Sequence, residues 1–586
     1  MDETRQMTGL RPAASKKHFH LFTKPNPISL RFALLIAIVA CFTAYPIALL
    51  FLSSFQINSP GQPIVWGLEG WRMAFSDASV PKALWNTFVL GFTRVAITTV
   101  FSVFFAWIIT RTDTPAKGFI EFMLWLGFFL PLLPMTLGWI LLLDPNYGII
   151  NKLIANWLGL SRGPFNIYSY GGIIWVHLAF STCVRVILLT PAFKALDATF
   201  EEAAHVAGSS AIATLTRITV PVLMPAVLAT TMLSFIKSME SMEIEIVLGI
   251  PARIFVFSTL VWDYTHFQPP AYHSATALSS IFLMAVFGLI WLQRTILGTR
   301  EYTTVGGRGY SVRVVRLGRW RWVAFGFSIV FIVVMIVLPM AVLVVGTFMK
   351  AFGYFSIPEP WTLNNWLGAF SDPILLRSLR NTLILGVGAG GLGALLYAIL
   401  GYNIVRSRVM GRQVLDFLVW LPWTLPGVLI SLALLWATLG IGKAVTPIYG
   451  TLYLLVLAIM IKELPLGTQI SKASVMQIGK ELEESSLVSG ASGPRTFRKI
   501  VIPLLLPAML ATALVVFVSA VRDIPVVVLL SSPSSRPLSL LMLDYMMAAE
   551  TEKATVIGVF VVVIIVVVAL VVRFFGLKKH IDPSQD

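Results

Sequence analysis

Charged residues are scarce in this chain, and cysteine is almost absent. Asp, Glu, Lys and Arg make up 12% of the 586 residues, whereas 57% are hydrophobic, and the mean hydropathy is +0.83. A soluble globular domain carries about twice that share of charge, so the composition indicates an integral membrane protein. The two cysteines, Cys41 and Cys183, lie inside apolar segments and predict neither a disulfide framework nor a metal site.

Several signals that would assign other functions are also missing. The alternating pattern of an outer-membrane barrel does not occur, so the spans must be helices. No phosphate loop G-x-x-x-x-G-K-[ST] occurs, because the nearest fragment, "GIGKA" at 440–444, has Ala437 where the first glycine would stand. The net charge of +16 is spread over short loops without interleaved aromatic residues, which argues against nucleic acid as a partner.

The apolar runs predict an all-α, polytopic membrane protein with about twelve transmembrane helices. The clearest run covers 554–575, longer than the roughly 20 residues needed to cross a bilayer. The run centres lie near residues 43, 97, 130, 179, 232, 284, 335, 391, 425, 459, 516 and 564. In the third and ninth runs, Pro131 with Pro134 and Pro422 with Pro426 are expected to bend the helices.

Basic residues set the predicted orientation. The first 29 residues are polar and basic and show no signal-peptide cleavage site, so we expect an uncleaved cytoplasmic tail. With that tail inside, the cytoplasmic loops hold most of the Lys and Arg, including six arginines within 298–321. Both termini are therefore predicted to be cytoplasmic, and the membrane to be the inner membrane of a bacterium.

The sequence repeats itself. Residues 200–225 and 482–507 agree at ten of 26 positions at an offset of 282. At an offset of 295, "WRMAFSD" recurs as "WLGAFSD" and "WNTFVLG" as "RNTLILG". Because each unit holds an even number of spans, the two six-helix repeats are predicted to be parallel. The predicted divisions are a basic tail at 1–29, a first repeat at 30–297, a linker at 298–321, a second repeat at 322–576 and a short tail at 577–586.

The repeated polar passage has a simple physical interpretation. Glu-Ala-Ala or Glu-Ser-Ser gives a helical turn with a small face, and the glycine four residues later ends or bends it. The isoleucine and proline further on are expected to start the return to the bilayer, since proline is tolerated in the first turn of a helix. One copy could be an ordinary solvated helical loop. Two copies favour a pair of short amphipathic helices that dock into another protein.

This spacing resembles the EAA motif in the transmembrane subunits of bacterial ABC importers that use a substrate-binding protein. The resemblance covers nearly everything after residue 30, with loops near 200–221 and 482–503. Departures are Ser-Ser for Ala-Ala in the second copy and Val220 or Ile502 where leucine usually precedes the proline. The matching residues are Glu202, Ala203, Ala204, Gly208, Ile218 and Pro221, and Glu484, Ser485, Ser486, Gly490, Ile500 and Pro503.

The resemblance implies a type I ABC importer permease fold in which both loops couple to two cytoplasmic ATPase subunits. ATP and Mg²⁺ would be bound by those subunits, and this chain would hold no cofactor, metal or catalytic residue. An external binding protein would deliver the solute. The length and the fusion of two repeats resemble permeases for ferric iron, so ferric iron is the first predicted solute. The alternatives are 2-aminoethylphosphonate, thiamine and polyamines.

Ionisable residues inside apolar segments are candidates for the translocation path, because charge in hydrocarbon is costly. Glu240 and Glu243 follow the first loop, and Arg522 and Asp523 follow the second. The alternative is that they cap helix ends at the outer interface. The acidic run slightly favours a cation, whereas Arg522 weakens that inference.

Other charged and aromatic residues have simpler expected positions. Arg185, Lys462 and Glu463 are expected near helix ends, where the basic side chains can reach the interface. Trp71 and Trp366 are expected in the interfacial aromatic belt.

A proton-coupled secondary transporter of the major facilitator type is the main alternative class, since it also has six plus six spans. Such a protein would carry a G-x-x-x-D-R-x-G-R-R-like loop after its second span, where this chain has "TRTDTPAKGF" at 110–119. A channel or structural membrane protein would not explain paired docking segments.

Overall fold

The computed structural model describes residues 30–197, 199–297, 314–407, 409–440 and 446–578. The predicted tail 1–29, most of the linker 298–321 and nearly all of the tail 577–586 lie outside these described residues. The described part is all-helical apart from isolated bridges.

Ten helices of the described residues are long and apolar enough to cross a membrane, or up to twelve spans if each of two bent pairs is counted as one. They are α1 (Leu30–Ser53), α3 (Ser79–Arg111), α7 (Tyr170–Ala195), α10 (Val220–Met239) with the turns before it, α12 (Tyr272–Leu297), α13 (Trp320–Ile332) with α14 (Leu338–Gly346), α16 (Pro373–Arg406), α19 (Leu452–Gln477), α22 (Ile502–Arg522) with the turns before it, and α24 (Thr551–Lys578). The shorter helices are α2 (Glu69–Ser76), α6 (Ile149–Leu158), α8 (Thr199–Val206), α9 (Ala211–Thr214), α11 (Phe257–His266), α15 (Asn364–Ser371), α20 (Lys480–Val488), α21 (Gly493–Thr496) and α23 (Leu538–Met547).

The bent pairs are the third and ninth spans, as the prolines predicted. Helices α4 (Lys117–Phe129) and α5 (Leu132–Leu143) meet at 102°, with Pro131 in the break. Helix α17 (Arg412–Trp420) and its 3₁₀ extension meet α18 (Gly427–Gly440) at 111°. Proline lacks an N–H donor and disfavours helical geometry in the preceding residue. The chain therefore turns sharply inside the protein at both places.

Repeated sequence motifs make repeated contacts. Thr87 of "WNTFVLG" accepts a hydrogen bond from the Phe257 amide at 2.8 Å, at the start of α11. Thr382 of "RNTLILG" accepts one from the Leu538 amide, also at 2.8 Å, at the start of α23. A helix start leaves several backbone N–H groups without a partner inside the helix, and these hydroxyls satisfy one each. The same interaction thus positions a short inner helix in both halves.

Trp71 and Trp366, the first residues of the motifs "WRMAFSD" and "WLGAFSD", make equivalent hydrogen bonds. Trp71 donates its indole N–H to Ser54 Oγ at 3.2 Å, and Trp366 donates to Thr347 Oγ1 at 3.0 Å. Their proposed place in an interfacial belt stays a prediction, but each ring fastens a short helix, α2 or α15, to the end of the first span of its half.

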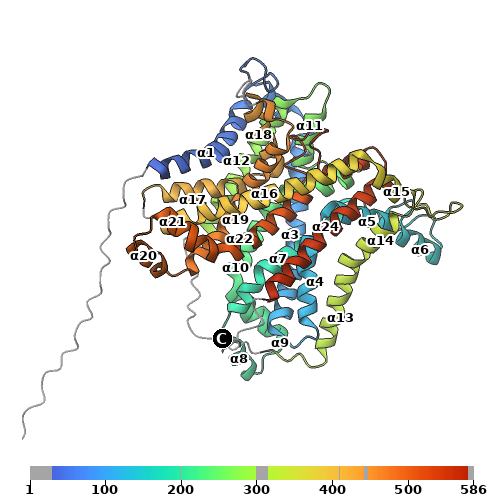
Figure 1. The fold of residues 1–586 in the computed structure, drawn as a ribbon. Helices are drawn as coiled ribbons and strands as arrows, with labels where there is room; N and C mark the ends of the chain where they lie inside the picture. Colours follow the sequence, from blue (N-terminus) through green and yellow to red (C-terminus); the bar gives the residue numbers. More distant parts are fainter. Residues whose placement is uncertain (1–29, 198, 298–313, 408, 441–445, 579–586) are drawn as a thin grey trace, which may run out of the picture.

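The halves are interlocked through their first spans (Figure 1). Helix α1 packs against α17 and α18 of the second half, while α13 and α14 pack against α4 and α5 of the first. Helices α5 and α14 come so close that a Cβ atom added to Gly138 would lie 2.1 Å from the Pro339 carbonyl oxygen. On α3, the Phe105 ring lies 4.8 Å from that of Phe331 on α13, centroid to centroid. Each half is therefore completed by a helix of the other.

We predict that Thr87→Val and Thr382→Val each lower the unfolding midpoint of the detergent-purified protein. Each change leaves a buried amide without an acceptor, which costs about 1–3 kcal/mol. Thr230→Val is the control, because Thr230 bonds only to carbonyls of its own helix, at 2.9 and 3.0 Å. Equal midpoints for all three variants would contradict the assignment.

Candidate functional site: the repeated loops and the charges between the halves

The two EAA-like segments form short helices that end at glycine. Helix α8 is followed by Gly208 with φ +82°, and α20 by Gly490 with φ +84°. The amide of Ser209 bonds to the Ala204 carbonyl at 2.9 Å, and that of Ala491 to the Ser486 carbonyl at 3.1 Å. This is the glycine-terminated helix end in which left-handed backbone lets the amides reach back to the last carbonyls. The prediction that Gly208 and Gly490 end the helices is confirmed.

Pro221 and Pro503 stand in the first turn of α10 and α22, as predicted for the prolines. The spans themselves begin earlier, at Ala211 and Gly493, so helical turns that were not predicted precede each proline. A π-helical turn precedes each proline, at Leu215–Thr219 and Phe497–Val501. The wider turn changes which carbonyls are bonded and so accommodates a residue without an N–H inside a helix. Ile218 and Ile500 belong to these turns.

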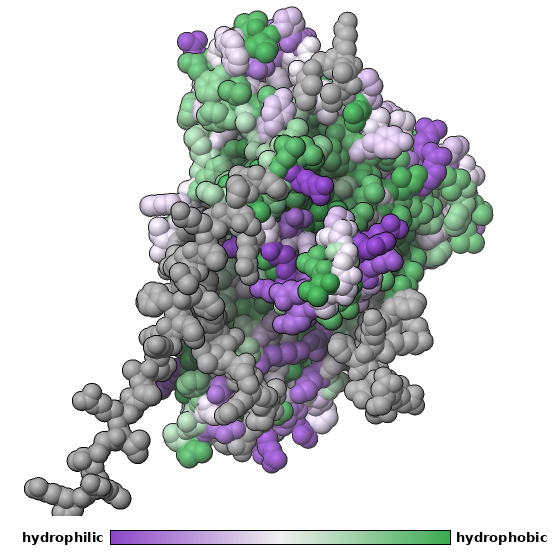
Figure 2. Space-filling view, turned by 60° about the vertical axis from the view of Figure 1, so that its left-hand side comes forward, coloured by the Kyte–Doolittle hydropathy of each residue, from purple (hydrophilic) through white to green (hydrophobic). Residues whose placement is uncertain are grey.

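Both short helices present apolar side chains at matching positions. Val206 and Val488 are each 89% exposed, and Phe200 and Leu482 are 51% and 49% exposed. Figure 2 shows hydrophilic residues gathered across the middle and lower part of one face, the side of the molecule that carries α20 in Figure 1. Bulky apolar groups exposed at equivalent positions of two short helices are what a pair of docking contacts requires.

The motif residues themselves differ in burial between the copies. Glu202 is half-buried, Ala203 is exposed and Ala204 is buried. In the second copy Glu484 and Ser485 are exposed. Ser486 is half-buried, and its Oγ lies 2.9 Å from Thr496 Oγ1.

An arginine anchors each segment to the spans, which the sequence analysis did not assign. Arg111, at the end of α3, donates from Nε to the Phe193 carbonyl at 3.0 Å and from Nη2 to the Leu196 carbonyl. Its Nη1 lies 3.6 Å from Glu201 Oε2, and the Glu201 carboxylate also accepts a hydrogen bond from Thr219 at 2.8 Å. Both charged side chains are almost fully buried. Arg111 therefore joins the end of α7 to α8.

The second half repeats this arrangement. Arg406, at the end of α16, pairs with Glu483 Oε1 at 2.7 Å through Nε. Its Nη2 donates to the carbonyls of Ile478 at 2.6 Å and Val475 at 3.2 Å. Tyr402 donates to the other Glu483 oxygen at 2.8 Å. We call Arg111 with Glu201, and Arg406 with Glu483, the arginine clasps.

A sequence signal for the clasps exists. The arginines are 295 residues apart and the glutamates 282 apart, the same offsets as the repeats around them. Taken one at a time in the sequence, the arginines indicate only the orientation of the loops, and their pairing with the glutamates was not predicted.

The candidate path residues meet where the halves face each other. Glu243 interacts electrostatically with Arg522, Asp523 and Lys462 of the second half. Lys462 bonds to Asp523, and Lys237 pairs with Glu240 at 2.9 Å. This cluster therefore contains charges of both signs contributed by both repeats.

Arg522 crosses from the second half to the first. Its Nη1 donates to the Phe128 carbonyl at 2.8 Å, and its guanidinium carbon lies 5.1 Å from the centre of the Phe180 ring. Glu240 and Asp523 cap α10 and α22, so the alternative of helix-end capping holds locally. These helix ends lie between the halves, and their expected place at the outer interface stays a prediction.

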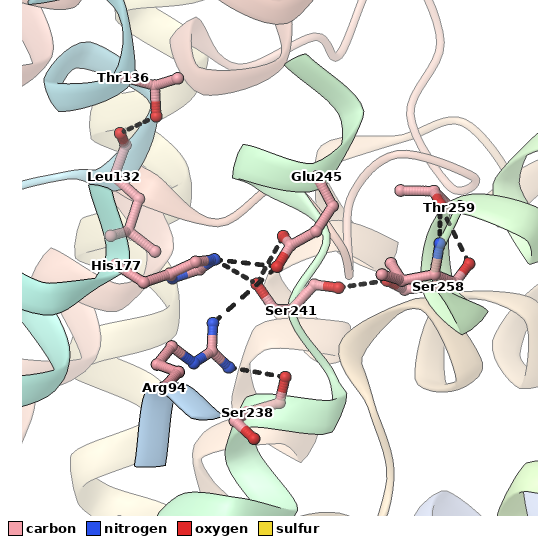
Figure 3. Close-up of polar contacts among 10 residues, drawn as sticks. Arg94, Leu132, Thr136, His177, Ser238, Ser241, Glu245, Ser258 and Thr259 are labelled. Carbon is pink, nitrogen blue, oxygen red and sulfur yellow. Dashed lines mark hydrogen bonds and ion pairs between the residues drawn. The ribbon is translucent and has the colours of Figure 1, made fainter. Parts of the chain in front are cut away.

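A second buried cluster lies beside this one in the first half (Figure 3). Glu245 accepts a hydrogen bond from Ser241 Oγ at 2.7 Å and lies 2.9 Å from His177 Nε2 and 3.9 Å from Arg94 Nη1. Arg94 also donates to the Ser238 carbonyl at 2.7 Å. The cluster connects α3, α7 and the segment after α10, so Glu245 has a structural role that the acidic run did not reveal.

Arg185 and Glu463 do not reach an interface from helix ends, whereas Lys462 is partly exposed and that expectation stays a prediction for it. Arg185 is 1% exposed in the body of α7 and bonds to the Val95 carbonyl at 2.7 Å and to Thr99 Oγ1. Glu463 is 7% exposed and accepts a hydrogen bond from Ser519 at 2.6 Å. Polar partners on neighbouring helices hold these groups inside the protein. Among the described residues, no group of three or more His, Cys, Asp or Glu side chains could hold a metal ion.

Comparison with known proteins identifies the family. The family described as "Binding-protein-dependent transport system inner membrane component" matches residues 389–586. The ferric transport system permease protein FbpB of Actinobacillus pleuropneumoniae is 25% identical over 518 residues, covering 86% of this chain and 71% of that protein. The chain belongs to this permease family.

Other relatives are similar to the permease over most of its length or over one half. The Fe(3+)-transport system permease protein FbpB 2 of Haemophilus influenzae is 23% identical, covering 72% of this chain and 79% of that protein. A chain of the crystal structure of a bacterial alginate ABC transporter, in complex with an alginate pentasaccharide-bound periplasmic protein, is 20% identical, with a TM-score of 0.39, and covers 46% of this chain and 96% of that chain.

Membership settles the function class. The permease is a multi-pass inner-membrane protein of a binding-protein-dependent ABC importer, and ATP hydrolysis takes place in separate subunits. Members of this family usually bind no cofactor themselves. The secondary transporter and the channel are therefore excluded.

We predict that Glu483→Ala loosens α20. The change removes the acceptor of Arg406 and Tyr402, which is worth about 1 kcal/mol for a partly shielded pair, so amide exchange across 480–488 should accelerate about fivefold. Glu484→Ala is the control, because that side chain is exposed and lies outside the clasp. Hydrogen exchange with mass spectrometry measures both. Equal exchange in the two variants would contradict a role for the clasp in holding α20.

Proposed function

We propose that the permease imports ferric iron and that α8 and α20 each dock into one of two cytoplasmic ATPase subunits. The observation that carries the docking proposal is the pair of equivalent short helices, each ending at a left-handed glycine and each displaying a valine that is 89% exposed. Two equivalent exposed helices, α8 and α20, can each bind one of two identical ATPase subunits, since each subunit would offer the same groove.

The proposed orientation follows from the charges. Both loops lie at the end of the bundle where α3, α7, α16 and α19 terminate, and the neighbouring loops carry the Lys and Arg excess. We therefore propose that this end of the bundle and both termini lie in the cytoplasm. The binding protein would then dock at the opposite end, near α6 and α15 (Figure 1).

The clasps suggest how the ATPase acts on the spans. A subunit that moves α8 also moves Glu201, and Arg111 connects that carboxylate to the ends of α3 and α7. Arg406 does the same for α20, α16 and α19. ATP binding and hydrolysis would thereby shift the balance between two access states of the path.

The proposed path lies between the halves. Glu240 and Glu243 of the first half and Arg522 and Asp523 of the second would line it, and the contact of Arg522 with Phe128 would close it. Transport needs binding that is weak enough for release, so a permease for a metal need not hold a strong metal site. The names of the two FbpB relatives and the acidic residues favour ferric iron; 2-aminoethylphosphonate, thiamine or a polyamine are the alternatives.

We predict that Val206→Glu and Val488→Glu each weaken binding of the ATPase subunit. The exposed valines contribute no internal packing, so folding should survive, while burying a charge in an apolar groove should lower affinity about tenfold or more. Co-purification and ATPase activity in nanodiscs measure the loss. Both readouts are taken without the binding protein, and Trp157→Glu is then the control, since Trp157 is 84% exposed on α6, far from α8 and α20.

A second pair of variants reaches the same contact by backbone geometry. Gly208→Leu and Gly490→Leu force a side chain into left-handed backbone, which costs about 1–2 kcal/mol, and should redirect the chain after each helix. If both the glutamate and the leucine variants retain normal ATPase binding and coupling, the docking proposal fails.

We predict that the solute is revealed by the binding protein encoded beside this chain. In proteoliposomes that contain the permease and its ATPase, the iron-loaded protein should stimulate ATP hydrolysis and internal accumulation of ⁵⁵Fe. Glu243→Gln should lower accumulation without lowering ATPase binding, because it removes a path charge far from α8 and α20. A binding protein that retains 2-aminoethylphosphonate, thiamine or a polyamine, but not iron, would overturn the iron assignment and leave the docking proposal intact.

A further inference from the structure

Arg185 is a buried cation whose charge is not balanced by the protein. Its side chain is 1% exposed, and its Nη1 is used by the Val95 carbonyl and by Thr99 Oγ1, both neutral. No ion pair with a carboxylate is found for it among the described residues, and the charged group that acts on it is another cation, Arg94. An uncompensated buried charge is strongly destabilising, typically by several kcal/mol.

The unused atoms of Arg185 form a defined binding edge. Nε and Nη2 are both buried and have no hydrogen-bond partner. These two atoms lie along one edge of the planar guanidinium and donate in parallel within that plane, the geometry that binds two oxygens of a carboxylate, phosphate or sulfate. Thr182 lies one helical turn earlier on the same face of α7, and its buried Oγ1 also has no partner. Three donors thus remain unused in one region of the first half.

The second half shows what the same position looks like when no charge is present. At the repeat offsets, Gly467 replaces Arg185 and Ala394 replaces Thr99. Tyr397 occupies the space, because its ring lies where a Cβ atom of Gly467 would stand, 2.0 Å from Cδ2. Its hydroxyl donates to the Met460 carbonyl at 2.7 Å. At this position the second half is filled by a tyrosine whose hydroxyl is hydrogen-bonded, whereas the first half keeps a cation with unpartnered donors.

We infer that the Nε and Nη2 edge of Arg185 binds a small oxyanion between α3, α7 and α10, in the first half only. The oxyanion balances the Arg185 charge, whereas the neighbouring charge of Arg94 is already paired with Glu245. The inference goes beyond the proposed function, since it concerns a bound anion and does not depend on the identity of the solute.

The test uses sulfate as the probe. The full chain in phosphatidylcholine nanodiscs, without ATPase, should bind about one [³⁵S]sulfate. Arg185→Lys keeps the charge but loses the paired donors, so its affinity should fall about tenfold or more, the effect of losing a charge-assisted hydrogen bond. Arg72→Lys is the control, because Arg72 is an exposed arginine outside the spans. Absence of stoichiometric binding, or equal affinity in wild type and Arg185→Lys, would overturn the inference.

A measurement on the wild-type chain guards against misfolded variants. Sulfate should raise the unfolding midpoint in a saturable manner at constant ionic strength, whereas no saturable rise would count against the site. Thr182→Val, which leaves Arg185 in place, should weaken the sulfate effect severalfold. Competition separates two sources of the oxyanion: displacement of sulfate by 2-aminoethylphosphonate would assign the site to an anionic solute, and lack of displacement would assign it to a resident anion.

Discussion

The arrangement of each half depends on a buried arginine at the end of its second span. Carbonyl groups at a helix C-terminus lack partners within the helix and carry the negative end of its dipole. Arg111 and Arg406 satisfy two such carbonyls each and pair with a glutamate of the adjoining loop helix. A long span, the end of its neighbour and a short exposed helix are thereby fixed to one another. These contacts are the connection through which a partner bound to α8 or α20, as proposed, would act on the spans.

Further along the same spans, buried charged residues form a second set of contacts, and the residue types in this set differ between the halves. In the first half, Arg94 and His177 surround the Glu245 carboxylate. In the second half, Lys462 bonds to Asp523, which holds the Val526 amide at 2.9 Å. The two halves share the contacts that hold α8 and α20 but differ in their buried charges. This difference is expected if α8 and α20 meet identical subunits, as proposed, while the charges between the halves meet one solute that needs no twofold symmetry.

The sequence predicted much of this structure because its strongest signals are local. The length of the apolar runs predicted the spans, Pro131 and Pro426 predicted the breaks, and Gly208 and Gly490 predicted the ends of the loop helices. The helical turns before Pro221 and Pro503 were not predicted, because a π-helical turn has no clear sequence signal. The sequence also predicted Arg185 near an interface, since a charge in an apolar segment is usually explained by reach to water, and only the packing of α3 shows that neutral groups hold it inside.

The interlocking of the halves was hidden for a related physical reason. Helices α5 and α18 are buried along nearly their whole length and are apolar on every side, so no amphipathic stripe shows which neighbour they face. The neighbours prove to be α14 and α1, each from the opposite half. Since Gly138 meets the backbone at Pro339, the two halves cannot part along this seam without losing close packing. A change between access states is therefore expected to keep the packing of α5 against α14 and of α1 against α18. The contacts that separate would then be those among the charged residues between the halves, such as Arg522 and Glu243.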